Sequence, residues 1–155
     1  GEAFGCCIPG IGAELCSAKA NWLRQHGAST GFCGLIGYAA DQAVGFAEIL
    51  PETMIPYPLG EKSAQRAFIT CLYSPNEWGL KLDYRVSLIR ALMGELPKHG
   101  YHELSIICGT ETPYPNGPEG ILLPLGFTRV KTMGKALLRH KWEEAWLLRK
   151  QLRWD

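Results

Sequence analysis

The residues that could bind a cofactor surround a strand, a turn and a helix in the middle of the chain. Residues 67–73 are apolar on both faces except at Thr70, as expected of a strand buried in the centre of a sheet. Pro75 ends this strand, and an amphipathic helix is predicted over residues 82–96. A strand that leads through a turn into a helix leaves free backbone amides at the helix start, where phosphate groups bind. This order predicts a site for a phosphate-bearing cofactor.

Cysteines are a second group of candidate reactive residues. Four of the six lie among apolar neighbours in predicted helix or strand, namely Cys16, Cys33, Cys71 and Cys108. Such positions are typical of buried free thiols. Cys6 and Cys7 lie in a glycine-rich start without CxxC spacing or a nearby histidine, so we expect no metal site within this chain. The chain begins at Gly1 rather than methionine, which suggests a tag remnant or a trimmed chain, and ligands from upstream would change that expectation.

Composition and charge narrow the class of protein. A chain of 155 residues with 46% apolar and 20% charged residues is expected to form a single domain over 1–155 with a sizeable core. The formal net charge is only +1, which argues against nucleic acid and a membrane surface as partners. The sequence has neither an apolar run of ~20 residues nor the start of a signal peptide. We therefore expect a soluble, cytoplasmic protein.

The domain is expected to have an N-terminal helical part, 1–30, and a core sheet with a cofactor-binding region, 31–155. A helix is predicted over about 12–25, with Gly27 as its C-cap. Strands 32–39 and 43–50 follow, and the short polar link between them predicts a hairpin. The proline-rich stretch 51–60 is interpreted either as one wall of a substrate pocket or as a rigid surface connector.

The second half of the chain continues with alternating elements. In helix 82–96 the apolar residues are spaced by three and four, which leaves Arg85 near the other, polar face. A strand is predicted at 103–108 and a short helix before Gly126. Residues 128–154 fit either two strands or a strand and a helix. Exposed tryptophans there would indicate a homodimer interface.

The ordered set of these features resembles the GNAT family of acetyl-CoA-dependent N-acetyltransferases. The set comprises the central strand, Tyr73-Ser74-Pro75, a polar turn with Gly79, the amphipathic helix, the next strand, Asn116, and Leu125-Gly126-Phe127. The resemblance covers roughly residues 32–152. It implies an α/β (α+β) fold with a mixed, mostly antiparallel sheet, a splayed central strand pair and flanking helices.

The resemblance also implies where acetyl-CoA, or another acyl-CoA, would bind. Backbone groups of Cys71, Leu72 and Tyr73 would bind the pantetheine arm. The turn after the strand would bind the pyrophosphate through Trp78, Gly79, Leu80 and Lys81. This turn departs from the family pattern, because only Gly79 is conventional and Asp83 adds a negative charge near the phosphates. Asn116 would contact CoA or cap the following helix.

The resemblance assigns the catalytic residues less directly. Many members use a tyrosine four residues before the Gly-Phe glycine to protonate the CoA thiolate, but that position is Leu122 here. Tyr114, on the loop after the strand, is the candidate acid in its place. Glu48 is the candidate general base, with an exposed structural glutamate as the alternative. Attack by Cys71 or Cys108 ranks below direct transfer, because no histidine is placed to activate either thiol.

The sequence thus predicts an enzyme that transfers an acyl group directly from acyl-CoA to a small-molecule or peptide amine, without a metal. One alternative is a non-catalytic module of the same fold that binds CoA or another small ligand. Another, which rests on Cys6 and Cys7 alone, is a cysteine-dependent metal or redox protein.

Overall fold

The computed structural model describes residues 13–74, 83–112, 116–138 and 140–152. The chain divides into two compact units, Gly1–Cys33 and Gly34–Asp155. The first contains helix α1, Ala13–Thr30, which ends at Gly31 with a φ of 70°. Gly31 has the left-handed conformation usual after a helix C-terminus, so the prediction that Gly27 ends the helix was wrong. Neither described α-helix is long and apolar enough to cross a membrane.

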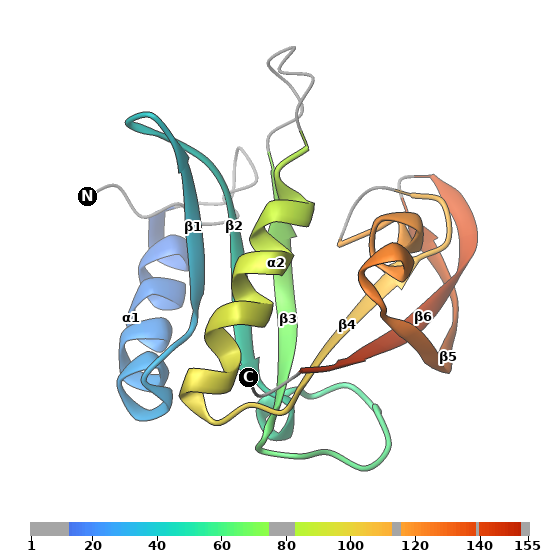
Figure 1. The fold of residues 1–155 in the computed structure, drawn as a ribbon, viewed down its shortest axis with the longest axis horizontal. Helices are drawn as coiled ribbons and strands as arrows, with labels where there is room; N and C mark the ends of the chain where they lie inside the picture. The colour runs from blue at the N-terminus through green and yellow to red at the C-terminus, as the bar shows by residue number, and fades with distance from the viewer. Residues whose placement is uncertain (1–12, 75–82, 113–115, 139, 153–155) are drawn as a thin grey trace. The chain divides into compact units, whose positions relative to one another are not determined.

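The second unit is built on a mixed six-stranded sheet with the order β1-β2-β3-β4-β6-β5 (Figure 1). Only β3 and β4 pair in parallel, and the other four neighbouring pairs are antiparallel. This confirms the predicted mixed, mostly antiparallel sheet. The strands are β1 Gly34–Ala39, β2 Gln42–Pro51, β3 Arg66–Tyr73, β4 Glu103–Gly109, β5 Thr128–Leu138 and β6 Lys141–Gln151.

Both hairpins follow from local sequence. β1 and β2 pair in antiparallel fashion across a two-residue turn at Ala40, whose φ is 51°, which confirms the predicted hairpin. At the end of the chain, β5 and β6 form a second hairpin. The alternative of a strand and a helix for residues 128–154 is wrong, because every other residue of Glu143–Leu147 is buried, the period of a strand.

Helix α2, Arg85–Glu95, packs against β1 and β2. Its buried side is formed by Leu88, Ile89 and Leu92 together with Arg85. A Cβ atom at Gly45 of β2 would lie 3.1 Å from a methyl carbon of Leu88 and 2.5 Å from the carbonyl oxygen of Tyr73. Glycine at this position therefore lets the helix and the end of β3 approach β2 closely.

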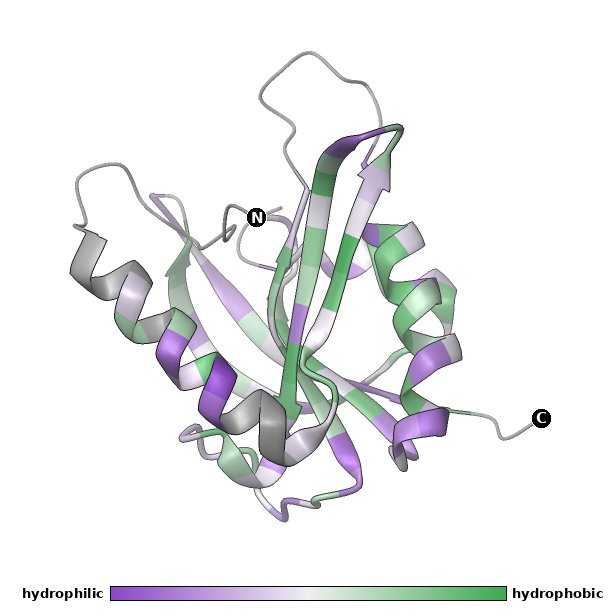
Figure 2. Ribbon diagram, turned by 90° about the vertical axis from the view of Figure 1, so that its left-hand side faces the viewer, coloured by the Kyte–Doolittle hydropathy of each residue, from purple (hydrophilic) through white to green (hydrophobic). Residues whose placement is uncertain are grey.

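A separate cluster of apolar side chains lies on the sheet and includes Leu50, Ile55, Leu59, Phe68 and Leu147. Figure 2 shows hydrophobic stretches along the strands, and hydrophilic residues on the helices as well as in the loops. Ile55 and Leu59 are each 3% exposed. Burial of such side chains stabilises the fold by about 1.5–3 kcal/mol each. Residues 56–58 and 60 are exposed, so the stretch 51–60 runs along the surface as a connector that Ile55 and Leu59 anchor to the core.

The predicted short helix before Gly126 is two 3₁₀ turns, η3 Glu119–Ile121 and η4 Leu123–Leu125. Gly126 ends the second turn with a φ of 85°. Two further 3₁₀ turns are η1, Glu52–Met54, and η2, Leu96–His99. Three of these short turns lie between strands, and η2 connects α2 to β4.

Candidate active site

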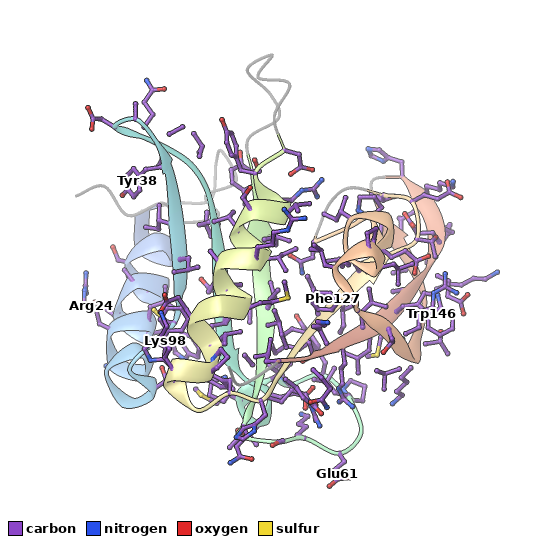
Figure 3. The ribbon with its side chains drawn as sticks, viewed as in Figure 1. Arg24, Tyr38, Glu61, Lys98, Phe127 and Trp146 are labelled. Atoms are coloured by element: carbon purple, nitrogen blue, oxygen red, sulfur yellow. The ribbon has the colours of Figure 1, made fainter. Side chains whose placement is uncertain are left out.

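The two parallel strands at the centre of the sheet separate partway along their length. Their pairing runs from Arg66 opposite Glu103 to Ile69 opposite Ile106 and then stops. The last four residues of β3 and the last three of β4 therefore diverge (Figure 1). This confirms the predicted splayed pair. Figure 3 shows Tyr38 on the β1 side of this gap and Trp146 on the β6 side, so the gap lies inside the sheet.

A β-bulge marks the point where β3 leaves β4. Glu48 of β2 pairs with Cys71 and the next residue, Ile49, pairs with Ile69, so Thr70 is the extra residue. The Thr70 hydroxyl donates to the Glu48 carboxylate at 2.7 Å and also lies 3.2 Å from the Glu48 carbonyl oxygen. Thr70 thus fixes a half-buried carboxylate directly opposite the diverging end of β3.

One backbone amide of β3 points into the gap. The N–H of Leu72 donates to Oδ1 of Asn116 at 2.8 Å. Successive amides of a strand point to opposite edges, so Cys71 and Tyr73 direct theirs toward β2. Among the three residues predicted to bind pantetheine, Leu72 is therefore the one that offers a donor to a ligand in the gap.

Arg85 joins the two sides of the gap. Its guanidinium forms an ion pair with Asp83, with Nη2 2.6 Å from Oδ2, and it donates to the carbonyl oxygen of Gly117. Hydrogen bonding to Arg85 lowers the pKa of Asp83, although partial burial of the carboxyl opposes the shift. Arg85 is 9% exposed, so its expected place on a polar, solvent-facing side was wrong. The negative charge of Asp83, expected to stand near phosphates, is paired.

The carboxylate of Glu143 holds the loop that follows β4. The Glu143 carboxylate of β6 accepts hydrogen bonds from the amides of Glu111 and Thr112, at 2.6 and 3.1 Å, and from the Thr110 hydroxyl at 3.1 Å. Burial alone would raise the pKa of Glu143, but these hydrogen bonds outweigh it and lower the pKa to about 2. A Cβ atom at Gly117 would lie 2.5 Å from the Thr112 carbonyl oxygen. Glu143 therefore holds residues 111 and 112 in place, and Gly117 packs against Thr112.

The structure also shows the surroundings of Leu122, at the position of the usual catalytic acid, and of Cys108, a candidate nucleophile. Leu122 is fully buried, so the position that holds a tyrosine in many GNAT members contributes an apolar side chain to the core. Cys108 is 2% exposed. Burial and the nearby charge of Glu119 raise the pKa of its thiol to about 12, despite the opposing charge of Arg129. A thiol with this pKa remains protonated at neutral pH and is a poor nucleophile.

The structure brings five of the predicted site residues together around the gap: Glu48, Cys71, Leu72, Tyr73 and Asn116. The other five lie outside the described residues: Trp78, Gly79, Leu80, Lys81 and Tyr114. Sequence reasoning assigned no role to Thr70 or Arg85. Thr70 was identifiable as the single polar residue in an apolar strand. The bond from Arg85 to Gly117 left no local signal, since Gly117 is remote in sequence.

An apolar groove of about 300 Å³ lies elsewhere, between β1 and the first turns of α2. Ile36, Tyr38, Tyr84 and Leu88 are among its lining residues. It is not lined by any of the five described residues around the gap, so it is separate from the predicted cofactor site.

Comparison with known proteins supports the fold. No family model matches the sequence, and no curated protein matches it. The ribosomal-protein-alanine N-acetyltransferase of Brucella melitensis is similar in structure, with a TM-score of 0.62 and 18% identity over 88% of this chain and 78% of that one. The proposed acetyltransferase yncA of Salmonella typhimurium, solved with acetyl-CoA, has a TM-score of 0.65 and 14% identity over 90% of this chain and 75% of that one.

A third similar structure is the ribosomal-protein-S18-alanine N-acetyltransferase of Escherichia coli, with a TM-score of 0.58 and 14% identity over 84% of this chain and 77% of that one. Together with the sheet order and the splayed strands, these similarities define the class: the chain has the GNAT acyltransferase fold. At this level of identity the similarity concerns the fold, and activity has to be argued from the site.

Proposed function

We propose that this chain transfers an acetyl or other acyl group from acyl-CoA to an amine of a small molecule or a peptide. The observation that carries the proposal is the Leu72 N–H, which points into the gap between β3 and β4. A donor fixed at this place can polarise a thioester carbonyl and stabilise the negative charge that develops on its oxygen. Acyl-CoA supplies the activated acyl group and the thiolate leaving group.

The residues around the gap fit such a ligand. Arg85 neutralises Asp83, so the start of α2 does not present an unpaired carboxylate to the phosphates of CoA. Backbone amides at the beginning of a helix favour phosphate binding. Trp78, Gly79, Leu80 and Lys81 are proposed to complete this part of the site, with Cys71 and Tyr73 beside the pantetheine arm.

Two proton transfers accompany amine acylation. The amine has to lose a proton before or during its attack on the carbonyl carbon, and the sulfur gains one as the thiolate departs. We assign Glu48 as the base that accepts the proton of the amine, because Thr70 holds its carboxylate opposite Cys71 at the diverging end of β3. We assign Tyr114 as the acid that donates a proton to the departing sulfur. Direct attack by the amine is favoured over an acyl-cysteine, since the Cys108 pKa of about 12 leaves that thiol protonated.

The second candidate function is a non-catalytic module that binds CoA. Leu122 favours it, because this buried side chain cannot supply the acid that many GNAT members place there. The two functions share the same binding site and differ only in chemistry. They can be separated by measuring binding and turnover in the same preparation.

The test is isothermal titration of the folded chain with acetyl-CoA and with free CoA, followed by mass spectrometry of a panel of amines incubated with acetyl-CoA. We expect micromolar binding of both ligands and acetylation of at least one class of amine. Binding of both ligands without acetylation of small amines or peptide N-termini would favour the non-catalytic module. A folded chain that binds neither ligand would rule out both.

A further inference from the structure

The side chain of Asn116 accepts the hydrogen bond of the Leu72 N–H, the donor that an acyl carbonyl would need. Its Oδ1 accepts the Leu72 N–H at 2.8 Å, across 44 residues of sequence. Leu72 is 2% exposed and Asn116 8%, so the bond is shielded from water. The carboxamide oxygen of Asn116 therefore stands where the proposed function places the oxygen of a thioester carbonyl.

The loop that presents Asn116 is held on two sides. Asn116 has a φ of 59°, a conformation that asparagine tolerates better than most residues. Its neighbour Gly117 accepts a hydrogen bond from Arg85 and rests against Thr112, whose amide is bound by Glu143. Asn116 is thus already ordered when it bonds to Leu72, and the contact costs little additional conformational entropy.

We propose that Asn116 is an internal competitor of the acyl carbonyl for the Leu72 amide, and so sets how strongly the chain discriminates acyl-CoA from free CoA. An acyl-CoA has to take this N–H from Asn116. Free CoA lacks the acyl carbonyl and leaves the bond in place. The inference rests on the proposed function and adds to it a residue that controls the relative affinity for substrate and product.

The energetic reason is the exchange of one hydrogen bond for another. In the native chain the acyl oxygen replaces an amide oxygen as acceptor, so the exchange yields little net gain. Without Asn116, a buried N–H would lack its protein acceptor, and an acyl oxygen would then gain a full hydrogen bond. Any contact that Asn116 makes with the CoA moiety itself affects both ligands and cancels in the ratio of their dissociation constants.

The experiment compares that ratio, Kd of CoA over Kd of acetyl-CoA, between variants by isothermal titration. Asn116→Ala is expected to raise the ratio about two- to tenfold, the equivalent of one neutral hydrogen bond. Asn116→Asp keeps an acceptor at the same place and is expected to leave the ratio at or below its native value. Gly120→Ala is the matched control in the same loop, because a Cβ atom there meets nothing within 4 Å.

A second readout needs no ligand. Asn116→Ala is expected to accelerate hydrogen exchange of the Leu72 amide relative to its neighbours in β3, while Gly120→Ala does not. If both ligands bind and the ratio is the same in the native chain and in Asn116→Ala, the competitor role is overturned while the proposed function stands. If neither ligand binds the native chain, the proposed function is overturned and the competitor role with it.

Discussion

The guanidinium of Arg85 donates a hydrogen bond to the carbonyl oxygen of Gly117, 32 residues away in sequence. Arg85 is the first residue of α2, which follows β3, and Gly117 lies on the loop that follows β4. The bond therefore ties together the two segments that leave the diverging strands. The same side chain is paired with Asp83, so a single buried cation holds the rim of the candidate site.

Arg85→Met is expected to lower the free energy of unfolding by about 1.5–3 kcal/mol, the range for a hydrogen bond to a charged group. The substitution leaves the Gly117 carbonyl and the Asp83 carboxylate without this partner. Chemical denaturation at neutral pH measures the loss. Arg90→Met, on the exposed side of the same helix, is the control and should have an effect below about 0.5 kcal/mol. Equal losses in the two variants would contradict the role of Arg85.

Glu48→Gln is expected to lower the turnover number about 100-fold near pH 7, because the amide cannot accept a proton from the substrate amine. The dissociation constant of acetyl-CoA should change little. The deficit should shrink at high pH, where the amine is already neutral. Glu61→Gln, an exposed carboxylate, is the control for turnover. A deficit that stays constant across the pH range would indicate that Glu48 only positions other groups.

The lowered pKa of Glu143 is expected to make the stability of the fold depend on pH below about 4.5. Its pKa is lowered to about 2 in the folded chain from an ordinary value of 4.5. The ionised carboxylate therefore stabilises the fold fully above about pH 4.5, and this contribution is lost as pH falls toward 2. We expect Glu143→Gln to melt several degrees lower at pH 7, and the difference from the native chain to shrink between pH 4.5 and 2.

The neighbouring Glu144→Gln is the matched control for this acid dependence. Glu144 is exposed and accepts a single hydrogen bond from the Thr132 hydroxyl at 3.0 Å. Thermal melts of both variants over the same pH series make the comparison. A constant difference between Glu143→Gln and the native chain at every pH would contradict the shifted pKa.

Glu52 links three elements at the paired end of the central strands. Its fully buried carboxylate contacts Arg66 Nη1 at 2.5 Å, Arg149 Nη2 at 3.1 Å and the Ser105 hydroxyl at 3.1 Å. Glu52→Ala would leave two guanidinium groups without this partner, and we expect a loss of about 3–5 kcal/mol in unfolding free energy. Glu95→Ala removes the exposed pair with Lys98 and is the control, with a much smaller expected loss because solvent screens exposed pairs.

Cys108 is expected to be unreactive. With a thiol pKa of about 12 and 2% exposure, it should resist alkylation by iodoacetamide at pH 8 in the folded chain and react only after denaturation. Cys108→Ala is expected to retain acyl transfer, measured as acetylated amine per enzyme over time. Loss of transfer in this variant, with an unchanged melting temperature, would instead support an acyl-cysteine route.

The sequence by itself determined most of the secondary structure. Strand alternation and turn chemistry predicted the β1–β2 hairpin, and the apolar run ending at Tyr73 predicted β3 within one residue of its start. The order of these elements was enough to indicate the GNAT fold. The end of α1 was not determined by local sequence: Gly27 fits a helix C-cap, but the helix continues to Thr30.

Only the tertiary structure decided how the candidate site is assembled. Thr70 meets Glu48 across 22 residues, Arg85 meets Gly117 across 32, and Leu72 meets Asn116 across 44. None of these pairs leaves a periodic or local pattern in the sequence. They form because the register of β2 on β3 and the divergence of β4 bring remote segments within hydrogen-bond distance. Propensity and spacing act over a few residues, whereas the site depends on where whole strands come to lie.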